Sequence, residues 1–266
     1  MEEEIFYPAT NDVIFKSLFI RKPNLLKGFL SAVLEIPRNE IVNLTIRNTE
    51  LLPDVYDGKF PRLDILLETK ERLINIEMQN AKTEDYKERV LFYWAEMYPR
   101  ELDKGKSYNA APAGVCINIM NFNMFSCEEY HSVFSVFERN RHELLTDKMQ
   151  LHFLELKKVS KKPDEKNFLQ LWMQVFKAKK KEEFEMLKTV NSTEIQESVD
   201  VIYALNADKQ VRELARQREK AERDYLADMA SAEEKGKKQR DLELASLWRA
   251  NGMSEEQIKK LLSGNF

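Results

Sequence analysis

The sequence is poor in glycine and proline, with only 7 and 8 of its 266 residues, about half of what average usage would give. This disfavours glycine-rich phosphate loops, collagen-like repeats and turn-dense all-β folds. An excess of one charge is also missing, since 42 Lys and Arg stand against 45 Asp and Glu for a net charge of -3. Such a chain is neither a basic tail protein nor an acidic disordered one.

Cysteine and histidine are scarce as well. The two cysteines, Cys116 and Cys127, form no Cys-x-x-Cys pair, and the three histidines form no His-x3-His pair. A structural zinc site or a disulfide framework is therefore disfavoured. We expect Cys116 to be a small buried hydrophobic residue, and the histidines to be partly buried in strands or turns.

No apolar run is long enough to cross a bilayer. The longest, such as 113–120, fall well short of the ~20 residues required, and the acidic start Met1-Glu2-Glu3-Glu4 is the opposite of a signal peptide's basic one. We therefore expect a cytoplasmic protein with no membrane partner. Hydrophobic residues make up 43% of the chain, which is ample for a core.

Hydrophobic spacing predicts an α/β order of elements. A first helix follows Thr10, which can cap it, and Asp12 lies favourably in its first turn. Apolar residues at helical spacing predict further helices at 25–33 and 82–104, with Pro99 kinking the latter, and the chain is predicted to be helical after Pro163. Strands are predicted at 41–49, 62–68, 73–79, 113–122, 132–138 and 150–157.

Three regions follow from this order. Residues 1–160 form the α/β core, 161–206 a helical subdomain, and 207–266 a long charged helix with a short terminal helical module. Between 207 and 243, ten basic residues balance ten acidic ones, so this helix either bridges solvent or pairs with another copy along a thin seam. We expect a homo-oligomer through this helix, and a folded core when 207–266 is deleted.

The chemistry is expected on the hairpin around residues 69–72. If its two strands pair symmetrically about that turn, the numbers of facing residues add to 141, so Asp64 faces Glu77. One face is then wholly apolar, while the other carries Asp64, Glu77 and Gln79. Two carboxylates at the ~5 Å spacing of opposed strand residues repel each other and need a reason.

Two interpretations account for these carboxylates. In the first, they lie on a solvated outer face, where Arg62 and the lysine of the turn screen the repulsion. In the second, they bind a divalent cation, because Mg²⁺ prefers carboxylate oxygens and water. Such an ion polarises a phosphodiester and generates hydroxide from bound water.

The residues also resemble a known family. The pair Arg62-Leu-Asp64 and Ile76-Glu77-Met78-Gln79 resembles the motif of the PD-(D/E)XK nuclease superfamily. Segments 11–19, 62–67, 75–79, 89–98 and 152–156 are similar, in the same order, to the recombination-promoting nuclease/putative transposase family. The resemblance implies a restriction-endonuclease-like core, a mixed sheet flanked by helices, with a helical C-terminal extension.

The resemblance also implies roles for individual residues. Asp64 and Glu77 correspond to the metal-binding carboxylates for Mg²⁺ or Mn²⁺, and Asp12 is a further acidic contributor. Gln79 stands where the superfamily usually has lysine. Because a neutral amide cannot stabilise the transition state by charge, we expect it to orient the attacking water or lend its carbonyl oxygen to the metal.

Three more residues are candidates for binding the phosphates of DNA. Arg89 and Tyr93 are four residues apart on the helix after the catalytic strand, where the resembling nucleases contact phosphate. The alternative places Tyr93 in the core, and pairs Arg89 with Asp85 or Glu88. Lys16 reaches either a phosphate or Asp12, and the ion pair is slightly favoured.

The leading function is a Mg²⁺-dependent DNA endonuclease associated with transposition or recombination. One alternative is a catalytically inactive nuclease fold that acts as an oligomerising interaction module. Another is a DNA-binding module without chemistry, in which residues 242–262 are the binding helices. The low net charge disfavours this last role as the whole function.

Overall fold

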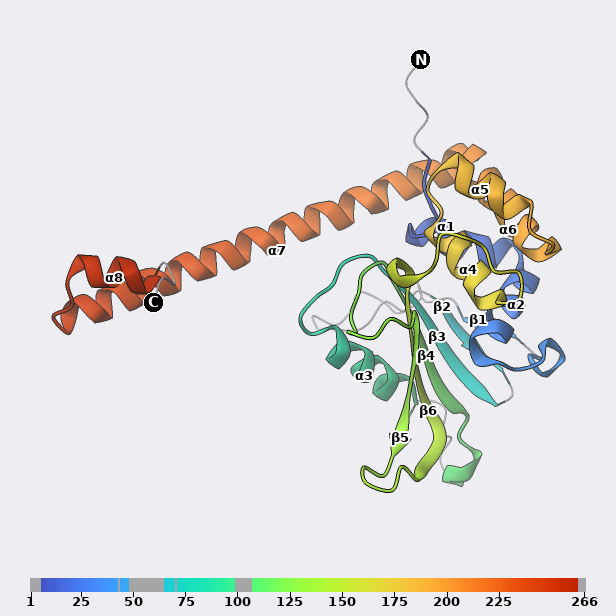
Figure 1. Cartoon of the computed structure of the whole chain (residues 1–266), viewed down its shortest axis with the longest axis horizontal. Coiled ribbons are helices and arrows are strands. Elements are labelled where there is room, and N and C mark those ends of the chain that lie inside the picture. Colours follow the sequence, from blue (N-terminus) through green and yellow to red (C-terminus); the bar gives the residue numbers. More distant parts are fainter. Residues whose placement is uncertain (1–5, 43, 48–64, 70, 99–106, 263–266) are drawn as a thin grey trace, which may run out of the picture. The chain divides into compact units, whose positions relative to one another are not determined.

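The computed structural model describes residues 6–42, 44–47, 65–69, 71–98 and 107–262. The chain divides into two compact units, 1–215 and 216–266, and each unit is described by itself (Figure 1). The predicted site residue Asp64 lies outside the described residues, as do Arg62 and Pro99.

The first unit is built on one six-stranded sheet of order β1-β2-β3-β4-β6-β5. β3 runs parallel to β4, and β4 runs parallel to β6, while the remaining neighbours are antiparallel. The strands are β1 (Thr45–Arg47), β2 (Ile65–Glu68), β3 (Arg72–Gln79), β4 (Ala113–Met120), β5 (His131–Phe137) and β6 (Leu144–Glu155). This mixed sheet confirms the predicted α/β class.

Helices cover both faces of the sheet (Figure 1). One face packs on α1, α2, α4 and α6 through a large apolar core, whereas α3 covers the other face through a smaller one. The helices of this unit are α1 (Asp12–Arg21), α2 (Pro23–Leu34), α3 (Tyr86–Met97), α4 (Phe168–Lys177), α5 (Lys181–Lys188) and α6 (Thr193–Ala207). The predicted sequence of helices and strands is therefore present, with shifted ends.

The cap of α1 is Asn11, so the prediction of Thr10 is wrong by one residue. Asn11 has extended backbone angles, and its Oδ1 accepts from the amides of Val13 at 3.1 Å and Ile14 at 3.4 Å. Thr10 instead lies in the preceding turn and is buried. Asparagine and threonine both cap helices, so residue type alone does not decide between the two positions.

The first unit is closed by contacts between its two ends. Asn206, at the end of α6, accepts a hydrogen bond from the Tyr7 amide at 2.7 Å and donates to the Tyr7 carbonyl at 3.0 Å. The first turns of α7 also belong to this core, because Val211 and Ala215 are buried in it. A deletion that begins at residue 207 would remove Val211 and Ala215 from this core. A deletion of the tail therefore has to begin closer to the C-terminus than expected.

The second unit contains most of α7 (Lys209–Ala250) and all of α8 (Glu255–Leu262). α7 ends shortly before Gly252, whose φ of 82° suits glycine. Ser254 and Gln257 then form a capping box, each side chain accepting from the other's amide. Several large apolar side chains of α7 within this unit are exposed, namely Tyr225, Leu226, Met229, Leu242 and Leu247.

Among the described residues, no helix combines the length and the apolar character that crossing a membrane requires.

Candidate active site on the α3 face of the sheet

The predicted register of the β2–β3 hairpin is confirmed wherever both strands are described. The facing pairs are Ile65 with Ile76, Leu66 with Asn75, Leu67 with Ile74 and Glu68 with Leu73. The two residue numbers of each pair add to 141, as the symmetric pairing requires. The predicted apolar face is also confirmed, because its described side chains are buried in the large core, namely Ile65, Leu67, Ile74, Ile76 and Met78.

The opposite face of the hairpin is not a solvated outer face. Leu73 and Asn75 are only 2% and 1% exposed, because α3 lies over this side of the sheet. Glu77 and Gln79 are half-buried at the carboxyl end of β3. The solvated-face interpretation is thus wrong for the part of this face that the structure describes. The pairing of Asp64 with Glu77 stays a prediction, since Asp64 lies outside the described residues.

Glu77 has a defined environment on β3. Asn75, two residues earlier on the same side of the strand, donates from Nδ2 to Glu77 Oε1 at 3.1 Å. On the neighbouring strand, burial raises the pKa of the Cys116 thiol far above its usual value, and the negative charge of Glu77 raises it further. Cys116 is consequently a neutral buried thiol, as predicted, and Glu77 lies close enough to influence it.

Gln79 is fixed at the end of β3. Its Nε2 donates to the carbonyl of Ala81 at 2.9 Å, and its backbone carbonyl accepts from the amide of Asn121 at 2.9 Å. The side-chain bond uses the nitrogen end of the amide, so the oxygen Oε1 is the end available to a ligand.

The start of α1 is tied to this end of β3. Asn80 donates from Nδ2 to the carbonyl of Thr10 at 2.9 Å. Asp12, the first residue of α1, follows Thr10 by two positions. The fold therefore brings the segment carrying Asp12 to the strand end that carries Gln79. Lys16, one turn further along α1, is half-buried.

Arg89 lies on α3 and stacks on an aromatic ring. Its guanidinium carbon is 5.0 Å from the ring centroid of Tyr86, whose hydroxyl donates to Asn118 Oδ1 at 3.3 Å. Asn118 is the register partner of Glu77 on β4. Arg89 Nε is buried and has no hydrogen-bond partner among the described residues.

The alternative ion pairs expected for Arg89 are not found among the described contacts. Asp85 accepts from the Arg89 amide through its backbone carbonyl at 2.9 Å, which is an ordinary helical bond. Among the described residues, the guanidinium is therefore held by the ring beneath it and not by an ion pair. Tyr93, one turn later on α3, is half-buried.

The donor set of the site fits a hard divalent cation. In the described ranges no group of three or more His, Cys, Asp and Glu could hold a metal, so a complete cage is not present in them. The Glu77 carboxylate and the Gln79 amide oxygen are both oxygen ligands, which Mg²⁺ prefers, and this ion commonly takes only one or two carboxylates. Asn75 Oδ1 is a further buried oxygen without a hydrogen-bond partner in the described part of the chain.

The sequence did not single out three residues that build this site: Asn75, Tyr86 and Asn118. Each polar group points between β3, β4 and α3, from positions where the surrounding residues are apolar. The signal that could have found them is an asparagine inside an otherwise apolar strand, because such a residue needs a buried hydrogen-bond partner.

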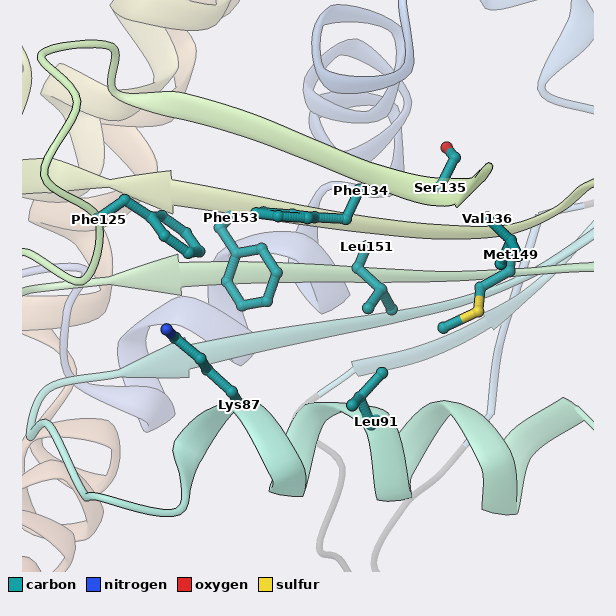
Figure 2. Close-up of a pocket in the computed structure, with 9 residues that line it drawn as sticks. All are labelled: Lys87, Leu91, Phe125, Phe134, Ser135, Val136, Met149, Leu151 and Phe153. Atoms are coloured by element: carbon teal, nitrogen blue, oxygen red, sulfur yellow. The ribbon is translucent and has the colours of Figure 1, made fainter. Parts of the chain in front are cut away.

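An apolar cavity of about 320 Å³ lies between α3 and the strands β5 and β6 (Figure 2). Its walls are mostly carbon, and Lys87 is its single charged side chain. No predicted site residue lines it, so it offers no group for chemistry on a phosphodiester. The lining residues are Lys87, Leu91, Phe125, Phe134, Ser135, Val136, Met149, Leu151 and Phe153.

A histidine pair is found toward the β5 edge of the sheet. Nε2 of His131 and Nδ1 of His152 are 3.0 Å apart. Burial, and then the proximity of His131, lower the pKa of His152 to about 3. Burial also lowers the pKa of His131, against the opposing effect of Glu35. Both rings are therefore neutral near pH 7. The expectation of partly buried histidines is confirmed for His131, whereas His152 is buried and His142 is exposed.

A mixed sheet flanked by helices, with an acidic residue and an amide two positions apart at the end of a central strand, defines a nuclease fold of the restriction-endonuclease-like class. The sequence matches the PD-(D/E)XK nuclease family transposase group over residues 9–232, and the chain belongs to that family. No curated protein and no solved structure matches the chain.

Proposed function

We propose that the protein is a Mg²⁺-dependent DNA endonuclease, active also with Mn²⁺, that serves transposition or recombination. The observation that carries this proposal is the placement of Glu77 and Gln79. Both are half-buried on the same side of β3, at the strand end where α1 begins. Family membership supports the same reaction class.

Glu77 and Asp64 are the proposed metal-binding carboxylates, with Asp12 as a further acidic contributor. When bound, a divalent cation polarises the phosphodiester and lowers the pKa of a coordinated water. Gln79 is held through its nitrogen by Ala81, which leaves Oε1 to orient the attacking water or to ligate the cation.

Arg89, Tyr93 and Lys16 are the proposed phosphate-binding residues. Arg89 supports this role best, because its guanidinium stacks on Tyr86 while Nε has no hydrogen-bond partner in the described part of the chain. A planar guanidinium with unused donors suits a phosphate oxygen. DNA is therefore the proposed partner, bound where α3 and the end of β3 meet.

Assembly through the C-terminal helix is a second part of the proposal. Exposed apolar residues of α7, among them Leu226 and Met229, favour contact with another copy of the same helix. The same observation supports the alternative function, a catalytically inactive nuclease fold that acts as an oligomerising or DNA-binding module.

Nicking of supercoiled plasmid separates the two functions. With Mg²⁺ we expect the wild type to nick, and excess EDTA to stop it. Glu77→Gln should lose about 100-fold or more of this activity, since a metal ligand matters at least as much as the groups that orient it. Glu71→Gln, which changes an exposed carboxylate in the hairpin turn, is the matched control and should keep full activity. A folded wild-type protein that never nicks, or a fully active Glu77→Gln, would leave the inactive module as the function.

A further inference from the structure

Asn75 is buried in the middle of β3 and uses only part of its hydrogen-bonding capacity. The residue is 1% exposed. Its Nδ2 donates to Glu77 Oε1 at 3.1 Å, while its Oδ1 is buried without a partner among the described residues. An acceptor left unsatisfied in the interior costs stability, so such a group in a native fold calls for an explanation.

Packing does not explain an amide at this position. The residues beside Asn75 in the sheet are Leu66 on β2 and Cys116 on β4, and both are apolar side chains. A β-branched aliphatic residue would fill such a place in a central strand and would leave no polar atom unsatisfied. What distinguishes Asn75 is its contact with Glu77.

We propose that Asn75 is a positioning residue that holds the Glu77 carboxylate in one orientation for a divalent cation. The inference rests on the proposed function, because it takes Glu77 as a metal ligand. A donor N–H bound to one carboxylate oxygen restricts how the carboxylate can turn, and so fixes where its other oxygen points. Groups that orient metal ligands in this way commonly govern metal affinity without touching the ion.

The other titratable and charged groups around Glu77 stay the same when only residue 75 is changed. On β4 this group is Cys116. On α3 these groups are Tyr86, which bonds to the register partner of Glu77, and Arg89, which stacks on Tyr86. Asp64 joins them if the pairing of β2 continues beyond its described residues. A changed metal affinity then reports the contact with Asn75 itself.

Asn75→Thr and Asn75→Val in the full-length protein form the matched test. The two side chains have nearly the same shape, but only threonine carries a hydroxyl donor. Mn²⁺ affinity is measured by calorimetry, with thermal unfolding measured in parallel. We expect Asn75→Val to weaken Mn²⁺ binding about tenfold or more, while its melting temperature stays equal to or above that of the wild type. Asn75→Thr should stay within about threefold of the wild type, because it keeps a donor beside Glu77.

Several results would overturn the inference. Unchanged Mn²⁺ affinity in Asn75→Val removes any role in metal binding. Equal losses in the threonine and valine variants show that the donor is not what matters. A lower melting temperature of Asn75→Val, with affinity restored when the protein is folded at low temperature, assigns Asn75 to the fold alone. A wild type that binds no Mn²⁺ instead refutes the proposed function, and this inference with it.

Discussion

The indole nitrogen of Trp94 donates to the carbonyl of Gly114 at 2.9 Å. This bond joins α3 to the start of β4, the strand that α3 covers. Gly114 has no room for a side chain, because an added Cβ would lie 2.6 Å from that same nitrogen. The close approach of helix and strand therefore depends on glycine, and it sets where α3 holds Arg89 relative to the sheet.

Gly114→Ala should destabilise the first unit. We expect a loss of roughly 1–3 kcal/mol in the free energy of unfolding, the usual cost of overpacking a well-filled interior, measured by urea denaturation. Gly236→Ala is the control, because an added Cβ there meets nothing within 4 Å. In the helix interior of α7 that change should raise helical stability by about 0.5–1 kcal/mol. Equal stability of Gly114→Ala and wild type would contradict the tight approach.

Gln79→Lys should keep substantial nicking activity. Lysine is the usual residue of the superfamily at this place, and its ammonium can make the same bond to the Ala81 carbonyl that the amide now makes. Gln79→Leu retains the bulk without a polar group and should lose about 100-fold or more in rate. Complete inactivity of Gln79→Lys would instead indicate that the amide oxygen ligates the metal directly.

The stability of the first unit should fall as the pH drops from about 6.5 toward 3. In this range the unfolded chain protonates the imidazole of residue 152, whereas the folded protein does not, because burial and His131 lower the pKa of His152 to about 3. The sign follows from linkage, since the free energy of unfolding rises with pH, and falls on acidification, wherever the unfolded state binds more protons. One such group contributes at most about 1.4 kcal/mol per pH unit.

His152→Leu is therefore expected to flatten the dependence of the free energy of unfolding on pH, measured by urea denaturation at pH 7.5, 5.5 and 4.5. His142→Asn changes an exposed histidine with a positive φ of 55°, which asparagine tolerates. This control should keep the wild-type slope. Identical slopes for wild type and His152→Leu would refute the assignment.

A protein of residues 1–217 should fold as a monomer. This cut keeps Val211 and Ala215, which are buried in the first unit, and removes the exposed apolar residues of the second. Full-length protein should sediment as a homodimer or larger assembly, and 1–217 should bind Mn²⁺ but cleave DNA less well. If both sediment as monomers, α7 plays no part in self-association.

The hairpin register was predictable because two independent regularities agree there. A four-residue turn sets the symmetry of the pairing, and strict alternation of apolar residues permits only one face to enter the core. Strand ends were less predictable. β6 begins at Leu144, earlier than the predicted 150, since its first residues pair with β5 in a hairpin whose side chains are largely exposed, among them Leu144 and Leu145.

The candidate site was predictable only where residue type reports chemistry. Glu77 and Gln79 stood out as polar residues on alternate positions of one strand. Asn75 did not, because its role depends on what α3 covers, and the burial of that face is a property of the tertiary packing. The alternative to phosphate binding paired Arg89 with an acidic neighbour on its helix, but the guanidinium lies on the ring of Tyr86, three residues earlier.

The contact between Tyr7 and Asn206 joins residues 199 positions apart, and this has a consequence for synthesis on the ribosome. The strands from β2 to β6 and the crossover helix α3 all emerge before residue 160, so the sheet can pair early. The apolar sides of α1 and α2 have no complete cover until α4 and α6 have followed. During that interval the nascent chain exposes two hydrophobic helices on the N-terminal side of the sheet, and a chaperone that binds such segments would find its target there.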